Sequence, residues 1–311
     1  MNPQLPASFQ LSIEVGRALS LNLPVVALES TVITHGLPYP ENLTLAGDME
    51  GEVRNFGAVP ATVAVLLGRV FIGLNNAQLQ ELASSQDIVK ISTRDLAPAM
   101  ARFLSGGTTV AGTMLVAHAA GIRVFATGGI GGVHRQAPFD VSADLPQLAK
   151  TPMIVVCAGA KAILDLPATL EYLETAGVPV VGYQTNDFPA FYSRSSGLKT
   201  SASADSAFQV VQIAKTHWSL GMQSAILVAA PPPEEVALPV ESVEQAIRQA
   251  LRDARGQNVH GQQVTPFLLK RVSELTGGAS LRANLGLLRN NARIAAEIAR
   301  QLSQGERFMR A

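Results

Sequence analysis

The chain has 311 residues, of which 47% are hydrophobic and only 15% charged, so it is long enough to bury a large core and is neither a small disulfide-stapled scaffold nor an extended disordered protein. The 24 Lys and Arg residues balance the 24 Asp and Glu residues. No net charge therefore attracts nucleic acid or an anionic membrane, and any anion that the protein binds must be held by local geometry.

Short apolar or β-branched runs alternate with helical patterns along the chain, which is typical of α/β proteins. Several runs are apolar at nearly every position, so they predict central strands that helices cover on both faces. The simplest architecture is a three-layer α/β/α sandwich around a mixed, largely buried sheet. The predicted strands are 25–29, 70–74, 88–92, 124–127, 154–158, 178–183 and 225–229.

Helical patterns lie between these strands, and several of them end at a glycine, which commonly terminates helices. The predicted helices are 42–56 before Gly57, 169–176 before Gly177, a helix capped by Ser203 or Asp205 that ends at Gly221, and a closing amphipathic helix over 280–302. The proline run 231–235 is the best linker candidate. Because candidate polar residues occur on both sides of it, we predict a single domain over 1–311.

Compartment signals are weak along the whole chain. The single cysteine, Cys157, cannot form an internal disulfide and lies in an apolar run that predicts a buried thiol. Asn22 and Pro24 interrupt the apolar stretch after Arg17, so no signal or transit peptide is expected. The segment 103–122 is too rich in Ser, Gly and Thr for a membrane span and predicts a loop followed by a buried helix. We expect a cytoplasmic protein.

The first chemical candidate is the carboxylate of Glu29, at the end of the first predicted strand. Ligands of open α/β sheets commonly lie at such strand ends. Partial burial raises the pKa of a carboxyl group, and the protonated form can then act as a general acid near neutral pH. The alternative is a carboxylate that satisfies backbone donors at a turn.

Two glycine-rich segments follow predicted secondary structure, SGGTTVAGT at 105–113 and TGGIGGVHR at 127–135. Glycines allow backbone N–H groups to approach phosphate oxygens, so both segments are candidate phosphate sites. Neither matches the P-loop GxxxxGK[ST], and the second departs from GxGxxG, so ATP and dinucleotide binding lack their signatures. Purely structural turns are the alternative.

The run FDVSADL places Asp140, Ser142 and Asp144 two residues apart. A strand would turn all three side chains to one side, and a helix would place the two carboxylates on one face. Either geometry gathers oxygen ligands for a hard divalent cation such as Mg²⁺ or Mn²⁺. The alternative is a solvated acidic turn with a helix cap.

Two lysines lie next to apolar strands. Lys161 follows the strand 154–158 among small apolar residues, and Lys90 lies inside the strand 88–92. Desolvation of an ammonium group favours the neutral amine, which can attack an aldehyde-level carbon. We favour Lys161 for that role and Lys90 for pairing with phosphate or carboxylate, whereas surface lysines with buried stems are the alternative for both.

Taken together, these segments closely resemble the pseudouridine-5'-phosphate glycosidases of the indigoidine synthase A-like family over roughly residues 24–296. The runs that carry the resemblance are ALESTVITHGLPYPEN, GGTTVAGTM, VFATGGIGGVHR, DVSADL, VVCAGAKAILD, TLEYLETAGVPVVGYQTNDFPAFY, TPFLL and SLRANLGLLRNNA. The resemblance implies reversible cleavage of the C–C glycosidic bond of pseudouridine 5'-phosphate to uracil and ribose 5-phosphate. It also implies a homotrimer and one largely water-coordinated Mn²⁺ ion.

The resemblance further implies roles for individual residues. Lys161 matches the Schiff-base nucleophile, Glu29 the proton donor and Asp140 the metal ligand. The implied substrate-binding residues are Lys90, Val110, Thr127, His134, Ser142, Ala143, Asp144 and Asn284.

The sequence departs from the family pattern in three places. The stretch between His134 and Asp140 is short, Ala162 stands where serine is common, and residues 258–263 replace a more familiar glycine- and lysine-containing stretch. Two other functions remain open: a sugar-phosphate-binding regulator without chemistry, and a nucleotide-dependent sugar kinase, for which the chain shows no second kinase-sized region.

Overall fold

The computed structural model describes residues 5–135, 137–259 and 264–308. Within these residues, one sheet has 11 strands with the main order β1-β4-β3-β2-β7-β10-β14-β12-β13, β6 pairs with β3 and β5, and a second sheet has the order β11-β8-β9. The strands are β1 (Phe9–Leu11), β2 (Val25–Leu28), β3 (Val59–Leu66), β4 (Arg69–Ile72), β5 (Val89–Ile91), β6 (Gly106–Thr108), β7 (Val124–Ala126), β8 (Val133–His134), β9 (Ala137–Val141), β10 (Ile154–Cys157), β11 (Leu164–Asp165), β12 (Val180–Tyr183), β13 (Ala202–Ala204) and β14 (Ile226–Ala229).

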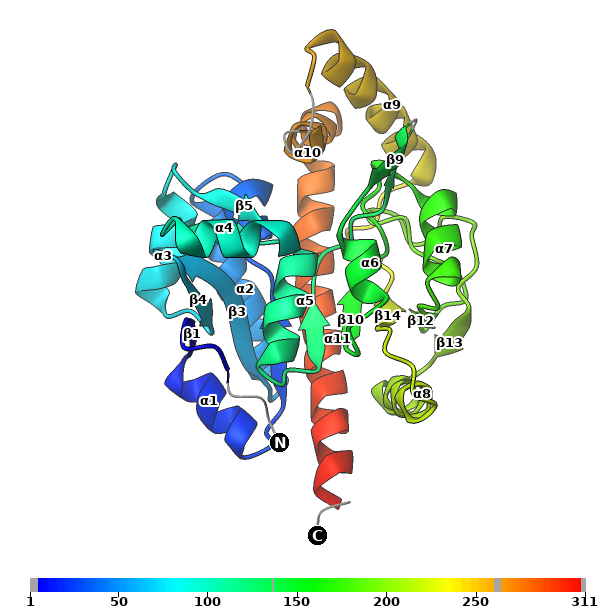
Figure 1. Cartoon of the computed structure of the whole chain (residues 1–311). Helices are drawn as coiled ribbons and strands as arrows, with labels where there is room; N and C mark the ends of the chain where they lie inside the picture. Colours follow the sequence, from blue (N-terminus) through cyan, green and yellow to red (C-terminus); the bar gives the residue numbers. More distant parts are fainter. Residues whose placement is uncertain (1–4, 136, 260–263, 309–311) are drawn as a thin grey trace.

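Helices cover both faces of the large sheet. The long helix α11 packs against α2 and α8 behind the sheet, and α5 and α6 lie in front of it (Figure 1). The helices are α1 (Ile13–Ser20), α2 (Glu41–Asn55), α3 (Asn76–Ser84), α4 (Leu96–Ala101), α5 (Val110–Ala119), α6 (Asp144–Leu148), α7 (Leu166–Thr175), α8 (Ala207–Ser219), α9 (Val240–Gly256), α10 (Val264–Leu275) and α11 (Ala279–Phe308), with short turns η1 (Val32–Gly36) and η2 (Thr93–Asp95). This confirms the predicted α/β class with a mixed sheet between helices.

The central strands are buried along their whole length, as their apolar runs predict. Every residue of β2, β7, β10, β12 and β14 is buried. The pairs β2–β7 and β7–β10 are parallel, with Leu28 and Val156 both in register with Ala126. Parallel strands end at the same edge of a sheet, so the segments that follow β2, β7 and β10 come together there.

The sequence analysis missed one strand and placed one helix cap wrongly. No strand was predicted over β3, although it lies between β4 and β2 in the large sheet. It pairs antiparallel with β4 and with β6. Its alanines and Pro60 have low β-propensity, and burial between neighbouring strands overrides that preference. Helix α8 is capped by Ser206 rather than by Ser203 or Asp205, because Ser203 belongs to β13, which pairs with β12.

The buried helix predicted within 103–122 is confirmed by α5, most of whose residues are buried, but the predicted loop before it also contains strand β6. No helix in the described ranges is both long and apolar enough to cross a membrane. Gln136 and residues 260–263, which belong to the two unusual stretches, lie outside the described residues.

Candidate active site

A buried pair of polar side chains lies at the ends of β2 and β7. Glu29 and Thr127 directly follow Leu28 and Ala126, which are paired in the sheet, so the register brings them together. The Thr127 hydroxyl donates a hydrogen bond to the Glu29 carboxylate. Glu29 is 6% exposed and Thr127 fully buried. Thr127, expected to bind substrate, therefore contacts Glu29 behind the cavity.

Burial controls the protonation of Glu29. It raises the pKa of the carboxyl group because the ionised form loses water, and the Asp144 carboxylate adds to this effect. Lys161, the Thr127 hydroxyl and Lys90 act in the opposite direction without cancelling it. The expectation of a carboxyl group with a raised pKa is met, and the geometry fits a proton donor.

Lys161 follows β10 in a segment that the TGGIGG loop holds from one side. The N–H of Ala158 donates to the carbonyl of Gly128 (2.8 Å), and the N–H of Lys161 donates to that of Ile130 (3.1 Å). The side chain of Lys161 is half-buried and lines the cavity described below. Nearby Cys157 is fully buried, and burial raises the pKa of its thiol to about 12, which makes it the inert structural thiol that was predicted.

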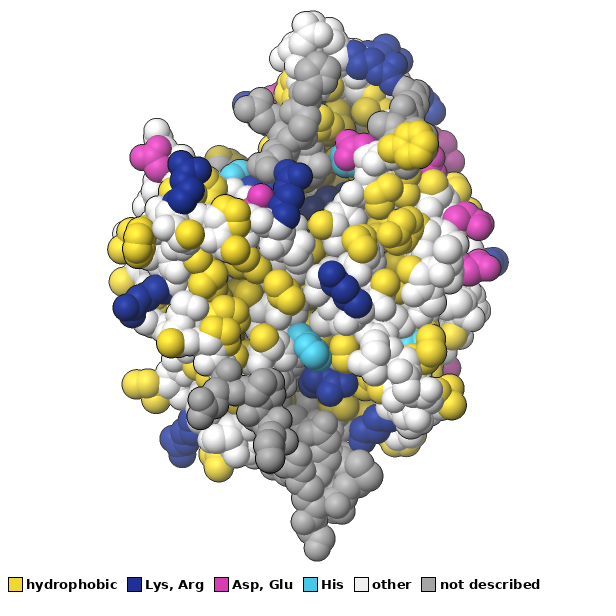
Figure 2. All heavy atoms as spheres, in the orientation of Figure 1, with side chains coloured by type: hydrophobic (Ala, Val, Ile, Leu, Met, Phe, Trp, Pro, Cys, Tyr) yellow, Lys and Arg dark blue, Asp and Glu magenta, His cyan; other side chains and the backbone are white. Residues whose placement is uncertain are grey.

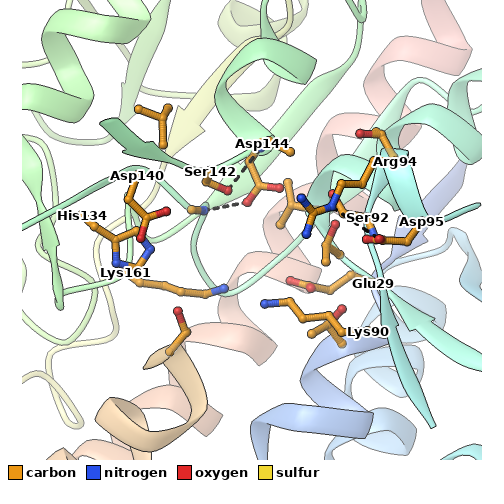
Figure 3. Close-up of a pocket in the computed structure, with 18 of the residues that line it drawn as sticks. Glu29, Lys90, Ser92, Arg94, Asp95, His134, Asp140, Ser142, Asp144 and Lys161 are labelled. Atoms are coloured by element: carbon orange, nitrogen blue, oxygen red, sulfur yellow. Dashed lines mark hydrogen bonds and ion pairs between the residues drawn. The ribbon is translucent and has the colours of Figure 1, made fainter. Parts of the chain in front are cut away.

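Lys90 reaches the same place from β5, on the other half of the molecule. Figure 3 shows Lys90 and Lys161 pointing toward each other, with Glu29 beside them. Burial and the positive charge of Lys161 lower the pKa of Lys90, while Asp144, Glu29 and Asp95 partly offset the shift. Two amines and a carboxylate therefore share one desolvated space.

These side chains open into a cavity of about 370 Å³. A smaller cavity of about 50 Å³ adjoins it, because Glu29, Lys90 and Lys161 line both. Of the other residues named from the sequence, Asn284 lines the smaller cavity. The large cavity takes Val110, His134, Asp140, Ser142, Ala143 and Asp144.

Some glycines and backbone amides of the two glycine-rich segments are engaged in contacts inside the protein. A Cβ on Gly131 would lie 2.2 Å from the Ser142 hydroxyl, and one on Gly129 would lie 2.6 Å from the Phe191 ring. The N–H of Gly131 donates to Asp144 (2.7 Å), and so does that of Ala111 at the start of α5 (2.9 Å). These two amides are engaged inside the protein, so the predicted phosphate role does not fall on them.

Asp144 and Asp140, predicted to share a face, have different environments. Asp144 is 5% exposed and joins α5 to the TGGIGG loop, whereas Asp140 is exposed on β9.

We expect Asp144→Ala to lower the free energy of unfolding by roughly 1–3 kcal/mol for each backbone amide left without an acceptor. Urea denaturation in a chelating buffer measures this effect. Asp140→Ala is the control and should unfold like the wild type; equal midpoints for both variants would contradict the assignment.

The donor set around Asp140 suits a weakly held hard cation. Among the described residues, no group of three or more His, Cys, Asp or Glu side chains is arranged to hold a metal. Asp140 nevertheless offers one carboxylate at the large cavity, beside Ser142. Ions such as Mg²⁺ and Mn²⁺ accept one or two carboxylates and complete their shell with water and phosphate oxygens, so the residues fit such an ion.

The sequence reading missed a polar turn at the cavity wall. Ser92, Arg94 and Asp95 line the large cavity directly after β5. The Asp95 carboxylate accepts a hydrogen bond from the N–H of Ser92 (3.0 Å), which closes a capping box around η2. The spacing S-x-x-D after a strand was the available signal. Thr265 on α10 lines both cavities and had no such signal.

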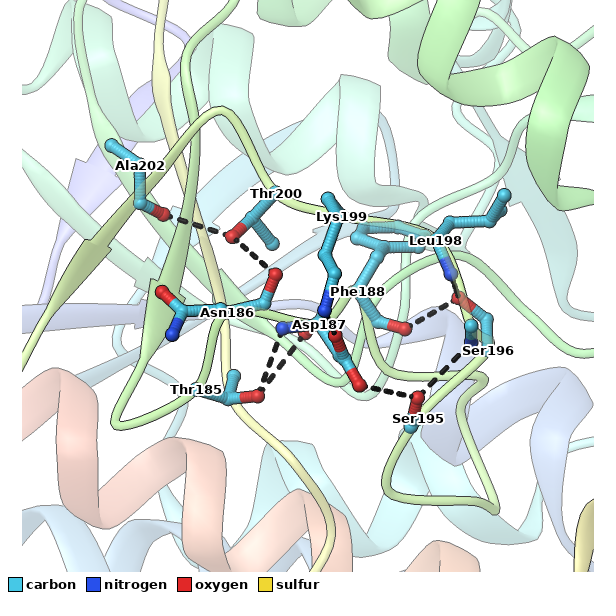
Figure 4. A network of polar contacts seen from close by, with 11 residues as sticks. Thr185, Asn186, Asp187, Phe188, Ser195, Ser196, Leu198, Lys199, Thr200 and Ala202 are labelled. Carbon is cyan, nitrogen blue, oxygen red and sulfur yellow. Dashed lines mark hydrogen bonds and ion pairs between the residues drawn. The ribbon is translucent and has the colours of Figure 1, made fainter.

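A second missed contribution comes from the loop over 184–201. Asp187 accepts hydrogen bonds from Ser195 (2.8 Å) and Lys199 (2.6 Å), which tie the two arms of the loop together (Figure 4). The loop carries Phe191 into the smaller cavity with a positive φ of 62°, which a bulky residue adopts rarely. Such a backbone requires a tightly held surrounding, and the polar ties supply it.

Helix α11 contributes one more buried residue, Asn291. Its amide donates to the carbonyls of Thr127 (2.8 Å) and Gly128 (3.3 Å), so the helix holds the segment that follows β7. Leu288 and Asn284 lie one and two turns earlier on the same face and line the smaller cavity. Two adjacent asparagines inside an amphipathic pattern were the signal.

The fold and the site define a class of α/β enzyme in which a lysine amine and a buried carboxyl group meet at the carboxyl ends of parallel strands. The chain belongs to the indigoidine synthase A-like family, whose model matches residues 14–301. The chain is 52% identical over 296 residues to the pseudouridine-5'-phosphate glycosidase of Caldanaerobacter subterraneus, covering 94% of this chain and 96% of that protein. It is 54% identical over 301 residues to the protein of the same name from Chloroflexus aurantiacus, covering 95% and 99%.

Two solved structures share the fold. The prealnumycin C-glycosynthase AlnA in complex with ribulose 5-phosphate superposes with a TM-score of 0.90 at 40% identity, covering 98% of this chain and 99% of AlnA. An indigoidine synthase A-like protein from Thermotoga maritima has a TM-score of 0.87 at 34% identity, covering 95% and 96%.

Proposed function

We propose that this protein is a pseudouridine-5'-phosphate glycosidase that reversibly cleaves the C–C bond between uracil and ribose 5-phosphate. The observation that carries the proposal is the identity of more than half of all aligned residues to glycosidases of that name over nearly their full length. The site supports it, because Lys161, Glu29 and Lys90 share one cavity.

The reaction needs more than ordinary glycosidase chemistry. An ordinary glycosidase protonates a heteroatom leaving group, whereas here the departing atom is C5 of uracil and the new proton ends on carbon. An amine addresses this difficulty. Nitrogen added at C1' can donate its electron pair to C1' as the electrons of the C–C bond leave with uracil, so that an iminium replaces an unassisted carbocation.

We propose Lys161 as that amine and Glu29 as the proton donor. The neutral amine forms a bond to C1' while the bond from C1' to the ring oxygen breaks, and that oxygen takes up the proton that the nitrogen then loses. The C1'–C5 bond then breaks as the C=N bond forms, and uracil receives a proton at C5. Water adds to the iminium, releases ribose 5-phosphate and restores the free amine.

The remaining lining residues support binding of the rest of the substrate. Lys90 and Arg94 supply positive charge at the large cavity, which suits the phosphate. Asn284 and Phe191 give the smaller cavity one amide and one aromatic face, which suits a flat base. We place Val110, His134, Ser142, Ala143 and Asp144 among the substrate contacts.

Release of uracil from pseudouridine 5'-phosphate in the presence of Mn²⁺, followed by ultraviolet absorbance and chromatography, tests the proposal. We expect uracil and ribose 5-phosphate in equal amounts, and the reverse reaction from both products. A regulator would bind ribose 5-phosphate without turnover, and a kinase would consume ATP. Either result without uracil release would refute the proposed function.

We propose that Asp140 holds one Mn²⁺ ion whose other ligands are largely water. The ion would supply positive charge that offsets the phosphate and orients it. We expect a chelator to lower kcat/KM at least about tenfold, and added Mn²⁺ to restore it. Asp140→Asn should raise the Mn²⁺ concentration needed for half-maximal activity without changing the thermal midpoint. Full activity of the wild type in chelator would contradict the assignment.

The homotrimer implied by the resemblance stays a prediction. Exposed apolar side chains support self-association: Phe103 and Leu115 are 74% and 41% exposed, and Phe139 is fully exposed. Figure 2 shows apolar side chains gathered in patches on the face that bears α4 and α5. Patches of this kind commonly mark interfaces.

A further inference from the structure

Arg135 makes an unusual set of contacts just outside the cavity. Its Nη2 donates to the carbonyl of Ala162 (2.9 Å) and its Nε to that of Leu164 (3.0 Å). The same guanidinium forms a two-pronged ion pair with Glu244 on α9, at 2.8 and 2.6 Å. One side chain thus joins helix α9 to the segment that directly follows Lys161.

That segment is a tight turn with buried backbone. The N–H of Leu164 donates to the carbonyl of Lys161 (3.0 Å), which closes the turn. Ala162 and Leu164 are 3% and 2% exposed, so water does not reach their carbonyls freely. Buried carbonyl groups need donors, and Arg135 supplies them.

The two sides of Lys161 are therefore fixed by different contacts. On the amino side, the carbonyl of Ile130 accepts the Lys161 N–H. On the carboxyl side, β11 pairs with β8, and Arg135, the residue after β8, binds the turn. Without Arg135, the backbone before Lys161 would stay anchored while the turn after it became more mobile. The side chain of Lys161 would then no longer be held in a single orientation.

Arginine suits this place better than lysine would. The planar guanidinium can bind two carbonyls and a carboxylate at once in a fixed plane, whereas an ammonium offers three donors around one point. The hydrogen bond from Arg135 lowers the pKa of Glu244, which keeps this carboxylate ionised at neutral pH. The side chains of Arg135 and Glu244 are only 22% and 33% exposed.

We propose that Arg135 is a positioning residue that, anchored by Glu244, holds the turn after Lys161 so that the amine points at the reacting carbon. The inference rests on the proposed function for the identity of that carbon. The positioning itself concerns only this chain.

Arg135→Lys is the decisive variant, and Arg271→Lys is its matched control. Arg271 also pairs with an acidic residue of α9, Asp253 (2.7 Å), at similar exposure, but it lies on α10 away from the Lys161 turn. We expect Arg135→Lys to lower kcat about 10–100-fold with KM within threefold, since displacements of about 1 Å can cost 10²-fold. Borohydride trapping of ribose 5-phosphate on Lys161 should slow by the same factor. Arg271→Lys should keep kcat within twofold.

A second readout needs no substrate. Reductive methylation with formaldehyde and cyanoborohydride, followed by peptide mass mapping, reports how accessible each lysine amine is. We expect Lys161 to be methylated at least threefold faster in Arg135→Lys than in the wild type, with Lys150 unchanged. If Arg135→Lys does not fold, Glu244→Gln, which keeps hydrogen-bond acceptance but removes the charge, should show the same changes at smaller size.

Unchanged kcat and unchanged Lys161 methylation in Arg135→Lys would overturn the inference, and so would an equal loss of kcat in Arg271→Lys. A wild type that releases no uracil and traps no sugar would instead refute the proposed function. In that case the methylation comparison alone decides the positioning role.

Discussion

Lys161→Ala is expected to lower kcat by at least about 10⁴-fold, because it removes the amine that attacks C1' in the proposed mechanism. The thermal midpoint should change little, since the Lys161 side chain is only half-buried and its backbone contacts to Ile130 and Leu164 remain. Uracil release under substrate saturation measures the loss. Ribose 5-phosphate should still bind, because Lys90 and Arg94 remain.

Charge and nucleophilicity are separated by Lys161→Arg. Arginine keeps the positive charge but stays protonated, so this variant should lose as much activity as the alanine variant. Lys150→Ala, on the exposed surface after α6, should keep full activity. Reduction with borohydride in the presence of ribose 5-phosphate should place the added mass on Lys161. Added mass on Lys90 instead, or substantial turnover by Lys161→Ala, would overturn the assignment.

The sequence predicts the inner part of the fold better than its edges. Strands β2, β7, β10, β12 and β14 read as continuous apolar runs because they are buried on both faces, and the structure has all of them. The short strands β8, β9 and β11 left no such pattern, since their pairing depends on contacts with distant segments. No local sequence pattern predicts that β8 pairs with β11, directly after the turn that follows Lys161.

The candidate site divides in the same way. Glu29, Lys90 and Lys161 were found because a charged residue beside an apolar strand is locally conspicuous. Asn291 and Phe191 were missed because one is a polar residue in a helix pattern and the other an aromatic residue in a long loop. Their roles arise only when α11 and the loop over 184–201 cross the ends of β7 and β10.

Three charged groups in one small space influence one another. Lys161 lowers the pKa of Lys90, while both lysines work against the desolvation that raises the pKa of Glu29. Each group therefore depends on the others, and removing one changes the rest. The raised pKa of Glu29 favours its protonated form, which suits a proton donor, and the lowered pKa of Lys90 favours its neutral amine.

Glu29→Gln is expected to lower kcat about 10²–10⁴-fold, the usual contribution of a positioned proton donor. Because burial raises the pKa of Glu29, wild-type activity that needs its protonated form should fall as pH rises through that raised value. The glutamine variant should lack this alkaline limb. A profile of kcat against pH measures both effects, and an unchanged limb in Glu29→Gln would assign the proton to another group.

The pH dependence of stability gives an independent check, because Glu29→Gln should lose activity but gain stability relative to the wild type. Below the unfolded pKa of about 4.3, Glu29 is protonated in both states; above it, the unfolded chain loses the proton first, so wild-type stability falls until pH passes the raised folded value. The free energy of unfolding of Glu29→Gln should therefore increase relative to that of the wild type as pH rises through this window. Glu50 is the matched control, because burial also raises its pKa and Thr62 donates to it (2.6 Å), but it lies outside both cavities. Glu50→Gln should show the same trend in stability while keeping kcat. A difference in the free energy of unfolding between Glu29→Gln and the wild type that does not change with pH would mean that the folded pKa of Glu29 is not raised and that Glu29 is not the acid.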